Sequence, residues 1–355
     1  MADDIYRSLQ QRLDMYSLGF PETSTSIELD ILKRLFSEKD AELFLHLSPR
    51  LEEPSVVAER TGRSVPDMEE HLEDMASRGL LFRKRKGDIV KYGAIPFMHG
   101  VMEFQVNSFD KELAEMVEQY YHDGLRASIA KSADLFMRTV PINQSIELTH
   151  EVASFEDACE IIRKADTIVV ADCICRKEKD MLGKGCGKPM ETCFMFGSMA
   201  QYYIENKLGR QIDAEEGIAI LKNAQDAGMV TQPATAQNPS GMCSCCGDCC
   251  GVLQSIKTHP RPAEIVFSNH YAVVDEDLCT GYGSCLDRCQ MEALAMGSDD
   301  LLKINLDRCI GCGLCVTECP TGALTLKLKD EAKRRVPPVS GGEQMMEMAK
   351  KRGIL

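Results

Sequence analysis

The sequence predicts an α+β protein in three parts, and three observations indicate it. Segments with apolar residues at helical spacing fill most of the first 142 residues. The apolar run DTIVVAD (166–172) predicts a buried strand among further helices in a cysteine-rich centre. Short strand-like runs then flank two cysteine motifs near the C-terminus. We therefore expect a helical N-terminal region, a central cysteine-rich α/β domain and a small C-terminal domain.

Charge and hydropathy exclude several classes of function. The formal net charge is −14, so the chain is no general binder of nucleic acid or of acidic membranes. The N-terminal stretch MADDIYRSLQ is acidic and polar, unlike a signal peptide. No apolar run approaches the roughly 20 residues that span a bilayer. These features predict a cytoplasmic protein without membrane insertion.

Cysteine usage dominates the composition. There are 17 cysteines, and the first 158 residues contain none of them. A secreted disulfide scaffold would need an export signal and is usually much smaller. In a reducing compartment, metal ligation is the main use for so many thiols. Cys159 lies at an apolar position of a predicted helix and is expected to be a packed thiol.

Residues 27–100 predict several short helices followed by a hairpin that turns at Lys86-Gly87-Asp88. This order resembles a winged helix-turn-helix domain, which implies either DNA binding or docking of a partner. The predicted recognition helix repels phosphate, because five acidic residues outnumber one arginine. Four basic residues on the wing favour DNA, but we expect docking. The acidic residues are Asp67, Glu69, Glu70, Glu73 and Asp74, against Arg78, and the basic ones are Arg83, Lys84, Arg85 and Lys86.

Domain boundaries follow from these shifts in composition. A long amphipathic helix is predicted over 109–132, and a charged tail with proline and glycine pairs follows residue 328. The expected parts are a winged-helix-like domain (1–102), a helical connector (103–142), a cysteine-rich iron–sulfur domain (143–268), a dicluster domain (269–328) and a flexible tail (329–355).

The run CIGCGLCVTECP (309–320) has the spacing C-x2-C-x2-C-x3-C-P. One tight loop with this spacing turns three thiolates toward one iron–sulfur cubane, and the fourth cysteine reaches a second cluster. Zinc sites prefer two separated pairs of ligands. From Tyr271 to about Lys327 the chain resembles the two-cluster bacterial ferredoxins. The resemblance implies one complete [4Fe-4S] cluster, held by Cys289, Cys309, Cys312 and Cys315.

The earlier run CTGYGSCLDRCQ (279–290) departs from the ferredoxin pattern twice. The resemblance assigns Cys279, Cys285 and Cys319 to the second cluster, and Tyr282 stands where a cysteine is expected. Gln290 occupies the usual position of proline. We expect a three-thiolate site, either in a [3Fe-4S] form or with a small ligand on the fourth iron. The alternatives are ligation by the Tyr282 phenolate, loss of the cluster with tyrosine filling its space, and an isolated substitution.

Nine central cysteines exceed by one the ligands of two cubanes. Cys243, Cys246 and Cys249 repeat the C-x2-C-x2-C spacing, which leaves Cys245 and Cys250 pointing elsewhere. We expect both central segments to fold together and to hold one or two more iron–sulfur clusters. Zinc–thiolate sites are the alternative, followed by a dithiol redox pair at Cys246 and Cys249. The nine are Cys173, Cys175, Cys186, Cys193, Cys243, Cys245, Cys246, Cys249 and Cys250, with Arg176, Lys177, Lys184 and Lys188 expected nearby.

No catalytic acid–base constellation stands out, and His99 is interpreted as a turn or core residue. The layout resembles multi-cluster iron–sulfur proteins of anaerobic metabolism. That resemblance implies an electron carrier or oxidoreductase subunit between a low-potential donor and a partner protein. Two alternatives are an enzyme with an open-coordination cluster at Tyr282, and a redox-sensing winged-helix regulator. We expect a redox partner protein and no DNA.

Overall fold

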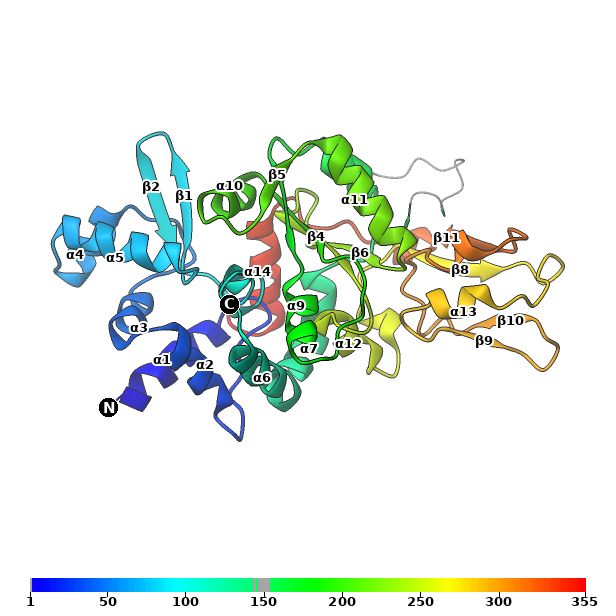
Figure 1. Ribbon diagram of the computed structural model, residues 1–355, viewed down its shortest axis with the longest axis horizontal. Helices are drawn as coiled ribbons and strands as arrows, with labels where there is room; N and C mark the ends of the chain where they lie inside the picture. The colour runs from blue at the N-terminus through cyan, green and yellow to red at the C-terminus, as the bar shows by residue number, and fades with distance from the viewer. Residues whose placement is uncertain (1, 143–144, 146–153) are drawn as a thin grey trace.

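The structure is a computed structural model that describes residues 2–142, 145 and 154–355. Figure 1 shows three parts along the long axis: N-terminal helices with a hairpin, a central sheet with its helices, and C-terminal hairpins at the opposite end. Helices and strands together make the predicted α+β class. In the part of the chain described, no helix is both long and apolar enough to cross a bilayer.

Local sequence signals set the ends of the N-terminal helices. Ser37 and Asp40 form a reciprocal capping box at the start of α3. Pro54 begins α4, and Gly62 ends it with a φ of 69°. Ser64 caps α5 by accepting a hydrogen bond from the Asp67 N–H. The helices are α1 (Ala2–Asp14), α2 (Ile27–Leu35), α3 (Glu38–Leu45), α4 (Pro54–Thr61) and α5 (Val65–Ser77).

Asp40 joins α3 to α5, and we expect its loss to destabilise the N-terminal part. Its side chain is 3% exposed and bonds to His71 Nε2 at 2.9 Å and to Arg78 at 3.0 Å. Burial alone would raise the pKa of Asp40, but hydrogen bonds from Arg78, His71 and Ser37 lower it to about 2. Because this folded pKa lies below the unfolded value, the stabilisation is present above about pH 4 and is lost as the pH falls toward 2.

Asp40→Asn should therefore lower the free energy of unfolding at pH 7 by about 1–3 kcal/mol. Urea unfolding followed by circular dichroism measures this. Glu70→Gln, at an exposed position of α5, is the matched control and should have no effect. Equal unfolding free energies for Asp40→Asn and wild type would contradict the assigned role.

An antiparallel hairpin follows α5, with β1 (Phe82–Lys86) paired to β2 (Ile89–Gly93). Helices followed by a hairpin are the order expected in this region. The base of the hairpin packs on α10 (Gly197–Glu205) of the central part. Phe82 stacks on Tyr202 with ring centroids 5.2 Å apart, and the Tyr202 hydroxyl donates to backbone carbonyls of the N-terminal part. The hairpin is thus a contact between two parts of the same chain.

The predicted helix over 109–132 is divided in the structure. Asp110 caps α6 (Lys111–Tyr120), a π-helical turn covers Tyr121–Leu125, and α7 (Arg126–Phe136) continues. The turn includes Gly124, where an added Cβ would lie 3.0 Å from Thr23 Cγ2. The two helices cross beneath the central sheet region and connect the N-terminal helices to it (Figure 1).

Five antiparallel strands form the central sheet in the order β5-β3-β4-β7-β6. One face packs Val170 and Phe194 against α8 and α11. Cys243 and Cys245 lie two residues apart on β7, so both belong to the opposite face, which shares a core with the N-terminal part. The elements are β3 (Ile168–Asp172), β4 (Glu191–Phe196), β5 (Arg210–Ile212), β6 (Val230–Pro233), β7 (Gly241–Cys245), α8 (Ala158–Arg163), α9 (Ile174–Met181), α11 (Ala214–Asp226) and α12 (Gly251–Lys257).

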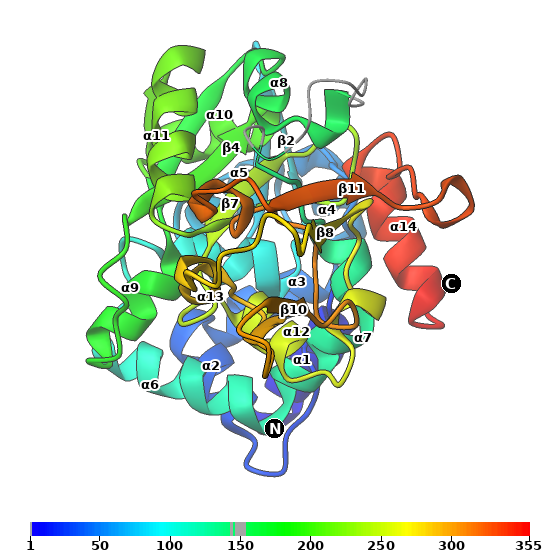
Figure 2. The same cartoon turned by 90° about the vertical axis from the view of Figure 1, so that its right-hand side faces the viewer.

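Two antiparallel strand pairs make the C-terminal part, which faces the viewer in Figure 2. Buried residues between the pairs include Ala272, Leu302 and Leu324. This small core holds two cysteine loops in place. The elements are β8 (His270–Val274) paired with β11 (Leu324–Leu328), β9 (Leu294–Met296) paired with β10 (Leu302–Ile304), and α13 (Ser284–Arg288).

The structure corrects the expectation of a flexible tail over 329–355. Its last section folds as α14 (Gly341–Lys351), capped by Ser340, and packs on α7. Met348 is fully buried, and the Gln344 amide donates to the carbonyls at the end of α7 at 2.8 Å. Met348 therefore covers the protein's own core, whereas Met346 is 53% exposed. The other domain boundaries remain predictions.

Candidate metal centres

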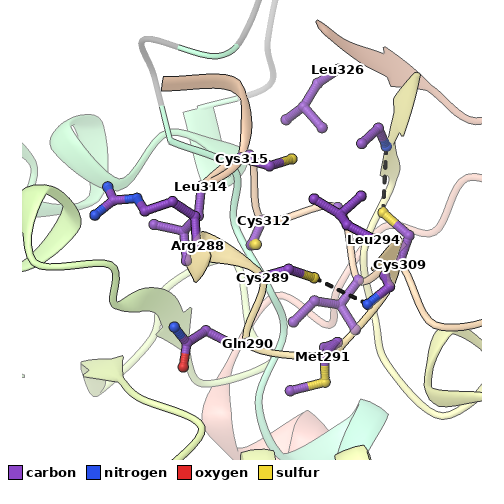
Figure 3. Close-up of a pocket in the computed structure, with 15 residues that line it drawn as sticks. Arg288, Cys289, Gln290, Met291, Leu294, Cys309, Cys312, Leu314, Cys315 and Leu326 are labelled. Carbon is purple, nitrogen blue, oxygen red and sulfur yellow. Dashed lines mark hydrogen bonds between the residues drawn. The ribbon is translucent and has the colours of Figure 1, made fainter. Parts of the chain in front are cut away.

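A first pocket lies in the C-terminal part. It is lined by the four cysteines that the ferredoxin resemblance assigned to one cluster. Figure 3 shows their sulfur atoms directed toward a shared space, with Leu294, Leu314 and Leu326 around it. We call this the first pocket, and its cysteines are Cys289, Cys309, Cys312 and Cys315.

The backbone of the first pocket is shaped around sulfur. Gly311 has a φ of 67°, and an added Cβ there would lie 2.2 Å from the His270 carbonyl oxygen. The Ala272 N–H donates to Cys309 Sγ at 3.4 Å, and the Ala293 N–H donates to Cys289 Sγ at 3.2 Å (Figure 3). Such N–H groups stabilise thiolate ligands. The glycine permits the tight loop, and the loop directs thiols inward.

A second pocket lies in the same C-terminal part. Its three cysteines are Cys279, Cys285 and Cys319. Gly281 and Gly283 have φ values of 68° and 82°, close to those of the glycines in the first loop. Tyr282 sits between them at the rim, and its side chain is 77% exposed. A side chain so exposed does not fill the pocket, which argues against the alternative of a lost cluster replaced by tyrosine.

Both pockets suit a [4Fe-4S] cubane. The donors are thiols, the loop glycines allow close approach of the backbone, and apolar residues form part of the lining of each pocket. Burial raises the pKa of Cys312 to about 12, so this thiol gives up its proton only when a cation takes its place. The residues present therefore fit the group that the cysteine spacing predicts.

Six of the nine central thiols form a closed ring of hydrogen-bonding contacts, here called the six-thiol ring. Each thiol contacts two others, one on either side. Among the described residues, the ring contributes no set of three sulfur atoms within 4.8 Å of one another. In order around the ring the six thiols are Cys173, Cys175, Cys250, Cys245, Cys243 and Cys193.

Lowered and raised pKa values alternate around this ring. Hydrogen bonds from Cys175 and Cys193 hold the pKa of Cys173 well below its ordinary value. Cys243 and Cys250 are lowered in pKa by their own two ring neighbours in the same way. The donating thiols have raised pKa values. Buried sulfur atoms that share protons in this way are suited to exchange those protons for metal ions.

The other three thiols form a separate three-thiol group of Cys186, Cys246 and Cys249. Their sulfur atoms all lie within 4.8 Å of one another, and Cys186 Sγ is 3.6 Å from Cys246 Sγ. A hydrogen bond from Cys249 lowers the pKa of Cys246 to about 6. Cys246 and Cys249 are buried, whereas Cys186 is half-buried on a glycine- and lysine-rich loop. This group therefore has one side near solvent.

Arg176 on α9 serves both sets of thiols. It is 2% exposed, donates to the Ser244 carbonyl at 3.1 Å and bonds Thr192 Oγ1. Burial disfavours its charge, but the nearby cysteines of both sets raise its pKa. Two of the lysines predicted nearby have other partners: Lys184 pairs with Glu118, and Lys177 lies 3.9 Å from Asp172.

The structure divides the predicted triple of Cys243, Cys246 and Cys249. Cys243 belongs to the six-thiol ring, because the strand period places it on the same sheet face as Cys245. The chain leaves β7 after Cys245, and the next two cysteines turn toward the loop of Cys186. The C-x2-C-x2-C spacing predicts ligands of one cluster only where a single loop carries all three cysteines. Here the first cysteine of the motif lies on strand β7, so the prediction fails.

Two residues near the ring were not identified from the sequence. His99, interpreted there as a turn or core residue, forms a hydrogen bond with Cys243, and its ring packs at a tilt against Phe136 with the centroids 4.2 Å apart. Its φ is 53°, which lies in the left-handed region of the backbone. A residue other than glycine keeps this conformation only where the surrounding structure holds it in place. Gln232 is fully buried, and neither of its amide atoms has a hydrogen-bond partner among the described residues. Strand pairing sets Gln232 opposite Cys243.

Gln290, the departure from proline, has a structural role. Its Oε1 accepts a hydrogen bond from the Gly247 N–H at 2.7 Å. Gly247 lies between Cys246 and Cys249, whereas Gln290 follows Cys289 and lines the first pocket. The three-thiol group and the first pocket are therefore joined through one side chain. A proline at 290 could not accept this bond.

Comparison with known proteins agrees with the C-terminal geometry. Residues 272–326 match the model of a 4Fe-4S dicluster domain, and residues 301–352 match a second model of the same description. Searches of the curated proteins and of the solved structures return no significant match. The matched segments contain both pockets and their cysteines. The C-terminal part of this chain is a two-cluster ferredoxin-type domain that binds iron–sulfur clusters.

Proposed function

We propose that the protein relays single electrons between its central thiol centres and a redox partner, through the ferredoxin-type domain. When bound, [4Fe-4S] clusters supply one-electron chemistry at low potential. The observation that carries the proposal is the hydrogen bond between Gln290 and Gly247, which fixes the first pocket beside the three-thiol group. A protein that relays electrons needs redox sites held at a fixed short distance from each other. Domains that act independently would not need such a bond between them.

Further contacts hold the ferredoxin-type domain in this position. Arg288 donates to the carbonyls of Asp226 and Gln225 at 2.7 and 2.9 Å. Arg308 donates to the Lys257 carbonyl at 3.0 Å. These bonds join the C-terminal part to α11 and α12 of the central part. They support a rigid path in which the first pocket is the inner site and the second pocket the outer one.

The partner is expected to dock at the outer end of the ferredoxin-type domain. Tyr282 and Leu278, on the loop of the second pocket, are large apolar side chains with exposures of 77% and 49%. Aromatic and aliphatic side chains at a surface, rimmed here by acidic residues of the same loops, suit a protein interface. We propose a low-potential donor, an oxidoreductase partner and a cytoplasmic location, for which the seventeen free thiols are suited.

Anaerobic reduction of the full chain tests the proposal. A photochemical one-electron reductant should give reduced-cluster signals in electron paramagnetic resonance, and a one-electron acceptor protein should remove them. No small substrate should be needed. Clusters that cannot be reduced, or turnover of a small molecule without any partner, would favour an enzyme instead.

Gln290→Pro should slow electron transfer between the central centres and the first pocket by about tenfold or more, because it removes the bond that fixes their spacing. Rapid-freeze resonance spectra after a reducing flash measure this rate. Gln290→Glu keeps an acceptor oxygen and is the control. An unchanged rate in Gln290→Pro, with both pockets filled, would show that this contact has no part in the relay.

We also propose that the N-terminal helix–hairpin unit docks within the chain and reads no DNA sequence. Arg83 of the hairpin is 4% exposed and binds Glu73 and Glu205, so this basic residue is already neutralised. Genomic fragments retained by the holo-protein should share no sequence and should elute at low salt. Recovery of one shared DNA sequence would instead support the alternative of a redox-sensing winged-helix regulator.

A further inference from the structure

The sulfur atoms of the three-thiol group are spaced as the ligands of a single metal ion are. Those of Cys186, Cys246 and Cys249 all lie within 4.8 Å of one another, and the first two are 3.6 Å apart. Around a tetrahedral zinc ion, ligands at the zinc–sulfur distance of about 2.3 Å lie about 3.8 Å from each other. The three sulfur atoms therefore fit three corners of such a tetrahedron.

The first pocket provides a comparison within the same structure. Its four cysteines belong to a domain that binds 4Fe-4S clusters, and among the described residues no three of their sulfur atoms lie within 4.8 Å of one another. The thiolates of a cubane are spread in this way because each of them binds a different iron. Sulfur atoms as close as those of Cys186 and Cys246 leave no room for a cubane between them.

Two separate segments of the chain build the three-thiol group. Cys246 and Cys249 form a C-x2-C pair, a spacing common in zinc sites, on a turn that the Cys250 N–H closes by donating to the Cys246 carbonyl at 3.1 Å. Cys186 comes from the glycine-rich loop that follows α9. In the part of the chain described, no further thiol, imidazole or carboxylate joins these three. Water or another small ligand would complete the tetrahedron on the side of the half-buried Cys186.

We propose that the three-thiol group binds one zinc ion, which holds in place the turn that contacts the ferredoxin-type domain. Gly247 lies within this turn and donates its N–H to Gln290 of that domain at 2.7 Å. Cys245 and Cys250 of the six-thiol ring flank the same turn in the sequence. The proposal goes beyond the proposed function, because zinc carries no electrons. The ion instead fixes the position of the six-thiol ring relative to the first pocket, and the relay runs between those two.

Metal analysis of the full chain, assembled anaerobically with both iron and zinc supplied, tests the proposal. The wild type should retain about one zinc per chain after gel filtration. Cys186→Ala and Cys249→Ala should each lose this zinc and keep the iron content of the wild type. Cys159→Ala is the matched control and should keep both metals, because Cys159 lies outside the three-thiol group.

X-ray absorption at the zinc edge of the wild-type protein decides the question even if the variants do not fold. We expect three sulfur neighbours at about 2.3 Å and one lighter atom. An iron neighbour of the zinc, a wild type without zinc, or loss of iron in place of zinc from Cys186→Ala would each overturn the proposal. Zinc retained by both variants would also contradict it, since the ion would then lie elsewhere. Reduction of the clusters in the ferredoxin-type domain is measured separately, so failure of the zinc site and failure of the relay are distinguishable.

Discussion

Tyr282→Cys is expected to convert the second pocket into a four-thiolate site that retains about one more iron. Tyr282 occupies the position that Cys312 holds in the first loop, and the flanking glycines have the same left-handed conformation in both loops. A cysteine there needs no change of backbone. Its shorter side chain would lie within the pocket, whereas the tyrosine is 77% exposed.

Electron paramagnetic resonance of the oxidised protein measures this change. The wild type should show a [3Fe-4S] signal, or a fourth iron removed by mild chelators, and the variant should show neither. Tyr282→Phe is the matched control, because it removes only the hydroxyl group. Identical spectra of wild type and Tyr282→Phe are expected, since an exposed phenol is poorly placed to ligate iron.

The outcomes separate the remaining readings of the second pocket. A signal altered in Tyr282→Phe would support ligation by the phenolate. Identical iron content and spectra in wild type and Tyr282→Cys would contradict the three-thiolate site. A substrate that quenches the wild-type signal and is turned over would favour the enzyme with an open iron, whereas a pure carrier should not respond to small molecules.

The ferredoxin-type domain could be predicted from the sequence because its ligands come from short loops. A single turn fixes the relation of Cys309, Cys312 and Cys315, so their spacing carries the three-dimensional information. The sequence shows that Gln290 replaces the proline of the ferredoxin pattern. It does not show why, because the partner of Gln290, the Gly247 N–H, lies about forty residues away in the chain. No local pattern relates those two positions.

The central ring could not be predicted because sheet pairing assembles it. Cys193 meets Cys243 through strand register, and register depends on the folded sheet. Periodicity within β7 does separate Cys243 and Cys245 from Cys246, but only once β7 is known to be a strand. His99 comes from a different part of the chain altogether, so nothing in its own surroundings indicates a metal centre.

The tail shows a similar limit. Its charged sequence with proline and glycine pairs is typical of a flexible end. The tail forms a helix because it packs on α7. Met348 is buried there, and the Gln344 amide donates to the carbonyls at the end of α7. Burial against a distant element, which sequence periodicity does not report, gives this helix its stability.

Arg176→Met is expected to lower the reduction potentials of the central centres and to reduce their iron content. The guanidinium is a buried positive charge with cysteines of both the six-thiol ring and the three-thiol group in its electrostatic surroundings. A unit charge at ~5–8 Å in a medium of effective dielectric near 20 contributes about 2–3 kcal/mol, which corresponds to roughly 100 mV for a one-electron couple. Removing it leaves the thiolates less compensated, so adding an electron costs more.

Redox titration followed by optical and resonance spectra measures the shift, and Arg176→Lys separates charge from shape. A lysine keeps the positive charge but loses the fork that binds the Ser244 carbonyl and Thr192. If charge sets the potential, Arg176→Lys should remain close to wild type in potential while losing some stability. If the two variants shift the potential equally, the fork that orders β7 and β4 is the deciding feature. The ferredoxin-type domain provides an internal standard, because its potentials should stay unchanged in both variants.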